Sequence, residues 1–301
     1  MRLLLLLMAL GACARHAPSR DADGVVPFDL AITIDDLPWA SVVPPDGRGP
    51  ATDRLLGHLA ARHVVATGFV NCGKPEQELL ERWRAAGHTL GNHTSSHLDI
   101  DKVPLDDWLA DARTCHEALE AQLGAPPTLF RFPYLRNGDD EATRDAARDT
   151  LLGWGQVLGR VTVDNHEWKI AFLYGEARRD GDEARARALA GTYVSHVRAA
   201  TAHYRAVARD RLGREPAHVL LLHANWLASD HLGTLLDALA EDGARFVPLE
   251  QALQDPLYAM PDARITAWGT SWLHHVAPHD TDGDFDTAEW RALIGAYEPE
   301  G

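Results

Sequence analysis

The sequence lacks any run rich in lysine or arginine, and its formal net charge over 301 residues is -15 at pH 7. Nucleic-acid binding needs a basic face that neutralises phosphates, so we expect no nucleic-acid partner. After its first residues the chain also lacks an apolar segment long enough to span a membrane. With 46% hydrophobic and 24% charged residues, the chain has the composition of a globular protein.

Cysteine is scarce, with three residues at Cys13, Cys72 and Cys115. In an oxidising compartment Cys72 and Cys115 could form a disulfide. Two buried free thiols fit the sequence equally well, because sequence does not show whether the two residues lie close enough to bond. The pairing is therefore left open at this point.

The first residues have the pattern of an export signal. Met1 and Arg2 precede the short apolar run LLLLLMAL, so residues 1–13 are predicted to be a secretory signal peptide. The tetrapeptide LGAC resembles a bacterial lipobox, which would place a lipid on Cys13 and anchor the protein to the cell envelope; the alternative is an ordinary signal peptide cleaved nearby. Both alternatives export the protein, which we expect in the periplasm. Residues 14–27 are predicted to be a polar tether, and the membrane is expected as a partner only through this lipid.

Apolar, β-branched runs alternate with helical patterns over residues 28–254. The candidate strands are residues 29–34, 63–70, 88–92, 129–134, 155–163, 218–223 and 245–249. Strands that alternate with helices favour a parallel sheet with right-handed crossovers. We therefore predict an α/β domain, an irregular seven-stranded (β/α) barrel over residues 28–254. Residues 255–301 have weaker periodicity and are predicted to be an extension packed on the barrel.

Polar residues follow the carboxyl ends of the candidate strands, where the catalytic groups of a β/α barrel collect. Any one of them alone is more simply explained as a turn, a cap or a structural residue. Their shared position on five strands favours a common site. They are Asp35 and Asp36, His93 and His97, Arg131 and Tyr134, Asp164, Glu167 and Trp168, and His223.

Two histidines four residues apart in GNHTSSHLD pose the question of a metal site. The pair lacks the glutamate of HExxH, which disfavours a zincin-type protease. A pair alone does not decide, because the same spacing occurs by chance. A third ligand is needed from elsewhere in the chain.

Five segments of the sequence resemble, in order, the motifs of the polysaccharide deacetylases, carbohydrate esterase family 4. They are ITIDDLP, GHTLGNHTSSH, RFPY, VDNHEW and VLLLH, and the run VATGFVN resembles a further strand of the family. The resemblance covers roughly residues 28–252 and implies an irregular seven-stranded β/α barrel. It also implies a metal-dependent hydrolase.

The resemblance implies a metal site formed by Asp36, His93 and His97. One carboxylate and two imidazoles suit Zn²⁺ or a similar divalent transition metal and leave positions for water and substrate. Such a centre acidifies a bound water and polarises a carbonyl. The metal ligands therefore answer the question raised by the histidine pair.

The resemblance also assigns catalytic roles. Asp35 would be the general base, held ionised by Arg131, and the backbone N–H of Tyr134 would lie in the oxyanion hole. His223 would be the general acid that protonates the departing amine. Asp164 and Glu167 belong to the same catalytic set.

Aromatic residues near the motifs are candidates for binding sugar. Trp168 would line the acetyl pocket, and Trp39 and Trp226 could stack on sugar rings, as could Trp268 or Trp272 of the extension. Ordinary packing explains any one of them equally well.

Three positions depart from the family pattern. Leu37 replaces a glycine, Leu98 replaces a proline and Glu167 replaces an aspartate. These departures remove no proposed ligand, base or acid, but they predict an altered pocket. The acidic run HDTDGDFD fails the EF-hand rule and is predicted to be a solvated loop.

The expected function is an exported deacetylase that hydrolyses the N-acetyl group of an amino-sugar glycan and releases acetate. An O-acetyl polysaccharide esterase with the same site is one alternative. A glycan-binding barrel without catalysis is the other, and the intact Asp35, Asp36 and His223 argue against it.

Overall fold

The computed structural model describes residues 25–40, 43–74, 76–266, 268–279, 282–283, 285 and 287–295. The signal peptide, Cys13 and most of the tether lie outside these residues. No helix in the described part is both long and apolar enough to cross a membrane.

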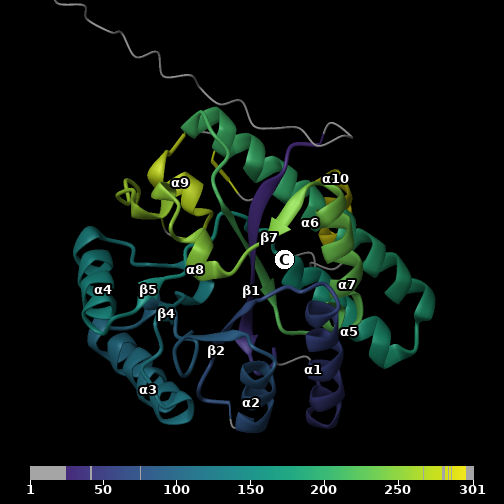
Figure 1. Ribbon diagram of the computed structural model, residues 1–301, viewed down its shortest axis with the longest axis horizontal. Coiled ribbons are helices and arrows are strands. Elements are labelled where there is room, and N and C mark those ends of the chain that lie inside the picture. Colours follow the sequence, from purple (N-terminus) through teal and green to yellow (C-terminus); the bar gives the residue numbers. More distant parts are fainter. Residues whose placement is uncertain are drawn as a thin grey trace, which may run out of the picture.

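Parallel strands form one sheet, and helices surround it (Figure 1). The strands are β1 (Phe28–Leu37), β2 (Thr67–Val70), β3 (Thr89–Asn92), β4 (Leu129–Phe130), β5 (Val157–Leu158), β6 (His218–His223) and β7 (Ala244–Phe246). Their order is β5-β4-β3-β2-β1-β6, and β7 pairs with the start of β1. A bridge between Val163 and Leu220 brings the chain after β5 beside β6. The predicted irregular, seven-stranded α/β barrel is confirmed, as a strongly curled sheet.

The helices alternate with the strands as the sequence predicts. The longer ones are α1 (Pro45–Ala60), α2 (Gln77–Ala85), α3 (Leu105–Leu123), α4 (Glu141–Gly153), α5 (Glu167–Asp180), α6 (Glu183–Leu212) and α7 (Trp226–Glu241). The short ones are η1 (Ile100–Lys102), η2 (Pro133–Leu135), α8 (Leu249–Ala252), η3 (Pro256–Ala259), α9 (Trp272–Val276) and α10 (Ala288–Gly295). Local signals fix their ends: the Asp182 side chain accepts from the Arg185 N–H at the start of α6, and Gly213, with φ 67°, ends it.

The first strand differs from its prediction in a way that matters for the site. It continues through Asp35 and Asp36 to Leu37, and the pairing with β2 shifts register between Ile34 and Leu37. Asp36 has a left-handed φ of 67° at this irregularity. In a regular strand adjacent side chains point to opposite faces. The left-handed residue turns the backbone, so that both carboxylates reach the same end of the sheet.

The core consists of apolar side chains between the sheet and its helices. β1 contributes Phe28, Leu30, Ile32 and Ile34, all at most 2% exposed. Trp39 is also in this core, 1% exposed, and its Nε1–H donates to Thr52 Oγ1 at 2.8 Å. The prediction that Trp39 stacks on sugar is therefore wrong, because no face of its ring is accessible.

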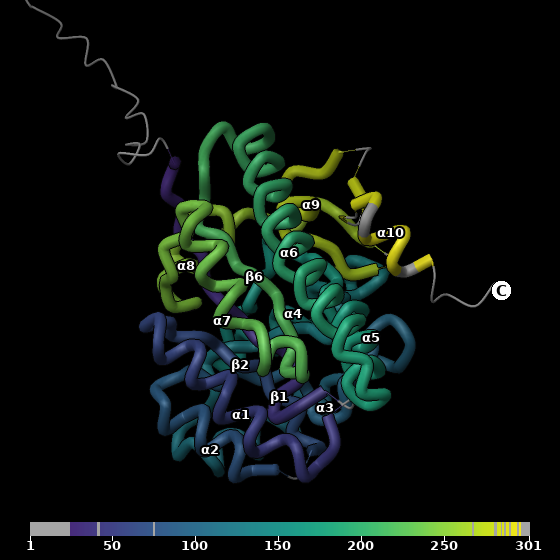
Figure 2. The backbone as a smooth tube through the Cα atoms, turned by 90° about the vertical axis from the view of Figure 1, so that its right-hand side faces the viewer, coloured from purple at the N-terminus to yellow at the C-terminus, as the bar shows by residue number. Residues whose placement is uncertain are grey.

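The described residues of the C-terminal extension pack on the barrel. In Figure 2, α9 and α10 lie beside α6. The Trp290 ring stacks on the His196 ring with centroids 4.5 Å apart. The acidic run is not solvated throughout, contrary to the prediction: the Asp282 side chain is 2% exposed and accepts hydrogen bonds from Arg211 and Arg264.

Cys72 and Cys115 form a disulfide, which resolves the alternative that the sequence left open. Cys72 follows β2, and Cys115 lies in the buried face of α3 with its Cα 5.1 Å from that of Cys72. The bond ties the loop after β2 to a helix. This loop also carries Asn71 and Lys74, which contact the site described next.

Candidate metal centre and active site

A cleft of about 540 Å³ opens at the carboxyl ends of the strands. The predicted site residues that line it are Asp35, Asp36, His93, His97, Tyr134, Asp164, Trp168 and His223. Arg131 and Glu167 lie behind this lining, and both are 1% exposed. The structure thus brings together residues from five segments that are far apart in the sequence.

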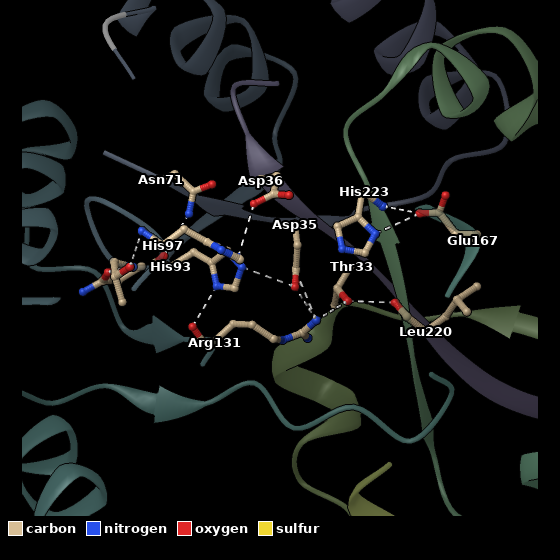
Figure 3. Close-up of polar contacts among 12 residues, drawn as sticks. Thr33, Asp35, Asp36, Asn71, His93, His97, Arg131, Glu167, Leu220 and His223 are labelled. Atoms are coloured by element: carbon tan, nitrogen blue, oxygen red, sulfur yellow. Dashed lines mark hydrogen bonds and ion pairs between the residues drawn. The ribbon is translucent and has the colours of Figure 1, made fainter. Parts of the chain in front are cut away.

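Asp36, His93 and His97 form a cluster of potential metal ligands. One donor atom from each lies within 4.8 Å of the others, and no other triple of His, Cys, Asp or Glu in the described residues does so. His97 Nε2 is 3.6 Å from Asp36 Oδ1 (Figure 3). The set of one carboxylate and two imidazoles fits Zn²⁺ or a similar divalent ion.

Backbone conformation brings these ligands together. Thr94 and His97 have left-handed φ values of 63° and 56°, so the chain after β3 curls back on itself. Thr94 Oγ1 accepts a hydrogen bond from the His97 N–H at 3.0 Å. Residues other than glycine adopt this conformation rarely, and such residues concentrate at functional sites.

Hydrogen bonding orients the His93 ring. Its Nδ1 bonds to the Arg131 carbonyl oxygen at 2.8 Å, and because the carbonyl can only accept, Nδ1 carries the proton. Nε2 is then a lone-pair donor directed to the cluster, an arrangement typical of metal-ligating histidines. Burial lowers the pKa of His93 and of His97 to about 4, so both rings are neutral at physiological pH, as ligands must be.

The loop after β2 supports the same cluster. Asn71 Nδ2 donates to the His93 carbonyl oxygen at 2.9 Å, and Lys74 Nζ donates to the Asp36 carbonyl oxygen at 3.1 Å. Lys74 also donates to Asn71 Oδ1 at 2.9 Å. The sequence analysis did not single out either residue; the only signal was the asparagine that ends VATGFVN.

Asp35 is buried beside the cluster and pairs with Arg131. Arg131 Nη1 donates to Asp35 Oδ1 at 3.2 Å and to Thr33 Oγ1 at 3.0 Å. Burial raises the pKa of Asp35 and outweighs the opposing charge of Arg131. The expectation that Arg131 simply holds Asp35 ionised is therefore incomplete: the guanidinium fixes the carboxylate in place, and burial makes that carboxylate more basic.

His223 lies across the cleft from the histidine pair and is bound to Glu167 (Figure 3). Glu167 Oε1 accepts a hydrogen bond from the backbone N–H of His223 at 2.7 Å and also contacts the ring Nδ1 of His223 at 3.0 Å. Burial alone would lower the pKa of His223, but the hydrogen bond and charge of Glu167, with the charges of Asp36 and Asp35, raise it to about 9. His223 is thus protonated at neutral pH, and Nε2 is the nitrogen left for the cleft.

The RFPY segment ends in a tight turn at the cleft. Tyr134 and Leu135 both have left-handed φ values, 58° and 55°. The Tyr134 ring, half exposed, lies with its centroid 4.4 Å from that of His97. The Tyr134 ring therefore lies beside the cluster of potential metal ligands, and the turn lines the cleft.

The remaining predicted residues divide between the cleft and the core. Asp164 lines the cleft, and its Oδ2 lies 3.4 Å from Nε2 of His166. His166 also lines the cleft and was not predicted from the sequence. Trp168 is half exposed and lines the cleft as predicted. Trp226 packs on the core and against Arg178 and is not among the lining residues, so its assignment to sugar binding is not supported by its position.

Two aromatic side chains add to the cleft. The sequence offered Trp268 or Trp272 of the C-terminal extension as residues that could stack on sugar. Trp268 is 62% exposed and lines the cleft, whereas Trp272 is buried. Phe172 on α5, 48% exposed, also lines it and was missed. Its spacing of four residues from Trp168 was the available signal, because positions i and i+4 share one helix face.

Comparisons with known proteins agree with this geometry. Residues 26–152 match the family model of polysaccharide deacetylases. A chitin deacetylase from Pestalotiopsis sp. is 29% identical over 149 residues, covering 48% of this chain and 45% of that protein. A peptidoglycan-N-acetylglucosamine deacetylase from Bacillus cereus is 30% identical over 146 residues, covering 47% and 46%. The chain thus spans less than half the length of these curated relatives.

Among solved structures, a CE4 family pseudoenzyme from Bacillus anthracis has a TM-score of 0.54 to this chain at 17% identity. The match covers 75% of this chain and 66% of that one. At this identity the likeness concerns the fold. The family match over residues 26–152 and the two curated relatives confirm the resemblance seen in the motifs: this part of the chain is similar to the polysaccharide deacetylases.

Proposed function

We propose that the chain is an exported, metal-dependent deacetylase that hydrolyses the N-acetyl group of an amino-sugar glycan and releases acetate. The observation that carries this proposal is the convergence of Asp36, His93 and His97 in one cleft with a buried carboxylate, Asp35, and a protonated imidazole, His223. The similarity to a chitin deacetylase and to a peptidoglycan-N-acetylglucosamine deacetylase supports a glycan substrate.

Asp36, His93 and His97 are the residues that would hold the cation. The donor set, the fixed proton on His93 Nδ1 and the neutral rings fit Zn²⁺. When bound, a divalent cation supplies a Lewis acid that polarises an acetyl carbonyl and acidifies a water molecule.

The chain's own groups supply the proton transfers. The Asp35 carboxylate takes a proton from the attacking water, whose oxygen bonds to the acetyl carbon. The Tyr134 N–H donates a hydrogen bond to the developing oxyanion. The C–N bond then breaks as His223 Nε2 donates its proton to the sugar nitrogen, since a neutral amine leaves far more readily than an amide anion. The products are acetate and a free amine.

The cleft lining supports a sugar substrate. Trp168, Phe172 and Trp268 are large aromatic side chains that are about half exposed around one opening. Exposed apolar surface gathered at a cleft is typical of a ligand site. Aromatic planes pack well on the apolar faces of sugar rings.

Export is supported by two features. The first is the signal-like residues 1–13, and the second is the disulfide between Cys72 and Cys115, because disulfides persist in oxidising compartments. We also propose a lipid on Cys13, with the protein in the periplasm. Mass spectrometry of the mature N-terminus tests this: an unmodified terminus at another residue would exclude the anchor.

The test of the main proposal is acetate release from a panel of N- and O-acetylated oligosaccharides, measured with and without added Zn²⁺. Release from N-acetylated members only supports the deacetylase. Release from O-acetylated members only would replace it with the esterase alternative. Sugar binding without acetate release from either set would identify a glycan-binding barrel. The Bacillus anthracis protein of the same fold is a pseudoenzyme.

A further inference from the structure

A segment of the C-terminal extension lies directly against the Tyr134 turn. This segment, residues 262–266 and 268–275, is called the strap below. We propose that the strap is a positioning element of the active site, which holds the Tyr134 N–H in the direction that the reaction requires. This inference rests on the proposed function, because that function gives the N–H its role.

The turn is the kind of structure that needs external support. Two consecutive residues with side chains, Tyr134 and Leu135, have φ values of 58° and 55°. Inside the turn, the Leu135 N–H donates to the Phe132 carbonyl at 3.1 Å and the Arg136 N–H to the Pro133 carbonyl at 3.1 Å. Such strained conformations persist only where surrounding structure fixes them.

Gly269 of the strap makes the closest contact with the turn. A methyl group built on Gly269 would lie 1.7 Å from the Tyr134 carbonyl oxygen and 2.7 Å from Leu135 Cβ. Only glycine leaves room for the two backbones to approach in this way. The Tyr134–Leu135 peptide group therefore rests on the strap backbone and cannot rotate toward it. The Tyr134 N–H belongs to the preceding peptide group, whose Pro133 carbonyl accepts from the Arg136 N–H within the same turn.

A second contact holds the far end of the turn. Asn137 is 3% exposed, and its Nδ2 donates to Asp262 Oδ2 at 2.8 Å. The other oxygen of Asp262 contacts His275 Nδ1 at 2.9 Å. The turn is thus fastened to the strap on both sides of Arg136, which itself lines the cleft.

The strap is in turn anchored to the barrel. Ser271 Oγ donates to the Thr162 carbonyl at 2.8 Å, and the Trp272 N–H donates to the Val161 carbonyl at 2.6 Å. The Arg160 guanidinium lies 4.1 Å from the centroid of the Trp272 ring. Ser271 and Trp272 are buried, so the strap has little freedom to move. The strap therefore connects the buried segment after β5, at Val161 and Thr162, with the Tyr134 turn and restricts the movement of that turn.

The test compares Gly269→Ala with Gly283→Ala in the full chain. Gly283 lies in the same extension, and a methyl group built on it meets nothing within 4 Å. For Gly269→Ala we expect kcat for acetate release to fall about 10²-fold with KM nearly unchanged, as for loss of one oxyanion donor. Zn²⁺ affinity should stay at the wild-type value. Gly283→Ala should match wild type throughout.

Amide hydrogen exchange gives a readout that does not need turnover. The N–H groups of Leu135 and Arg136 are bonded within the turn, so their exchange should quicken in Gly269→Ala and not in Gly283→Ala. If Gly269→Ala does not fold, Asn137→Ala, which adds no atoms, replaces it, with a smaller fall in kcat and the same change in exchange.

The outcomes separate the two proposals. A folded Gly269→Ala with wild-type kcat and wild-type exchange would overturn the role of the strap. A wild-type chain that releases no acetate from any substrate would overturn the proposed function instead, and the exchange comparison would still decide whether the strap holds the turn.

Discussion

The histidines on the two sides of the cleft share one residue type but differ in charge. Burial lowers the pKa of His93 and His97 to about 4, whereas His223 has a pKa raised to about 9. The difference lies in the partner: His93 Nδ1 bonds to a neutral carbonyl, and His223 Nδ1 contacts the carboxylate of Glu167. One cleft therefore holds two neutral imidazoles and one protonated imidazole, without any difference in residue type.

The largest effect should follow from substituting one of the proposed metal ligands, Asp36 or His97. Asp36→Ala removes the carboxylate and leaves two imidazoles, so we expect loss of both Zn²⁺ binding and acetate release; His97→Ala should do the same. Metal content after dialysis and acetate assays measure these losses. Asp53→Ala, at an exposed position paired with Arg82, is the control and should keep both properties. An Asp36→Ala protein with one tightly bound Zn²⁺ would show that the ligand set is wrong.

Asp35→Asn tests the base while sparing the ligands. The amide keeps the shape of the carboxylate but cannot accept a proton, so kcat should fall about 10²- to 10⁴-fold with Zn²⁺ retained. Acetate assays at saturating substrate, beside metal analysis of the same sample, measure the separation. Retained turnover would mean that another group accepts the proton.

Glu167→Gln tests why His223 differs in charge from His93 and His97, because it removes the carboxylate charge beside His223. The pKa of His223 should fall, so the alkaline loss of kcat should begin at lower pH than in the wild type, where it is expected as the pH rises through about 9. A bound cation shifts this limb downward in both proteins, so the difference between them is the quantity to measure. Glu176→Gln, on the same helix and paired with Arg185, should leave the profile unchanged.

The same pKa has a consequence for stability. The folded-state pKa of His223 lies above its ordinary value of 6.5, so protonation favours the folded chain at low pH. This contribution is complete below about pH 6.5 and is lost as the pH rises through about 9. Denaturant unfolding at pH 6 and pH 10 should show a larger loss of stability in wild type than in Glu167→Gln; equal losses would contradict the assignment.

Trp268→Ala should have the smallest effect. Loss of one aromatic contact with a sugar corresponds to about 0.5–1.5 kcal/mol, which is a rise in KM of roughly twofold to more than tenfold for an oligosaccharide. Activity on a small acetyl ester should be unchanged, since such a substrate does not reach the extension. Equal losses on both substrates would show that Trp268 acts through the structure of the site rather than by contact with sugar.

The sequence was sufficient to predict those residues of the site that have characteristic polar side chains and directly follow a strand. Asp36, His93, His97 and His223 belong to short motifs, and parallel strands bring their carboxyl ends together. Features that depend on packing across distant segments could not be predicted. Trp39 follows the aspartate pair in sequence yet enters the core, and Asp282 sits in a polar run yet is buried between two arginines.

The contact between Gly269 and Tyr134 bears on where this protein can be cut. Strand periodicity and motif similarity both end near residue 254, which would be the natural terminus for a shortened recombinant fragment. Such a fragment would retain each side chain assigned to chemistry and would lose the backbone on which the Tyr134 peptide rests. The proposed role of the strap therefore predicts that the smallest active unit is longer than the region of motif similarity, so expression trials should retain the residues after 254.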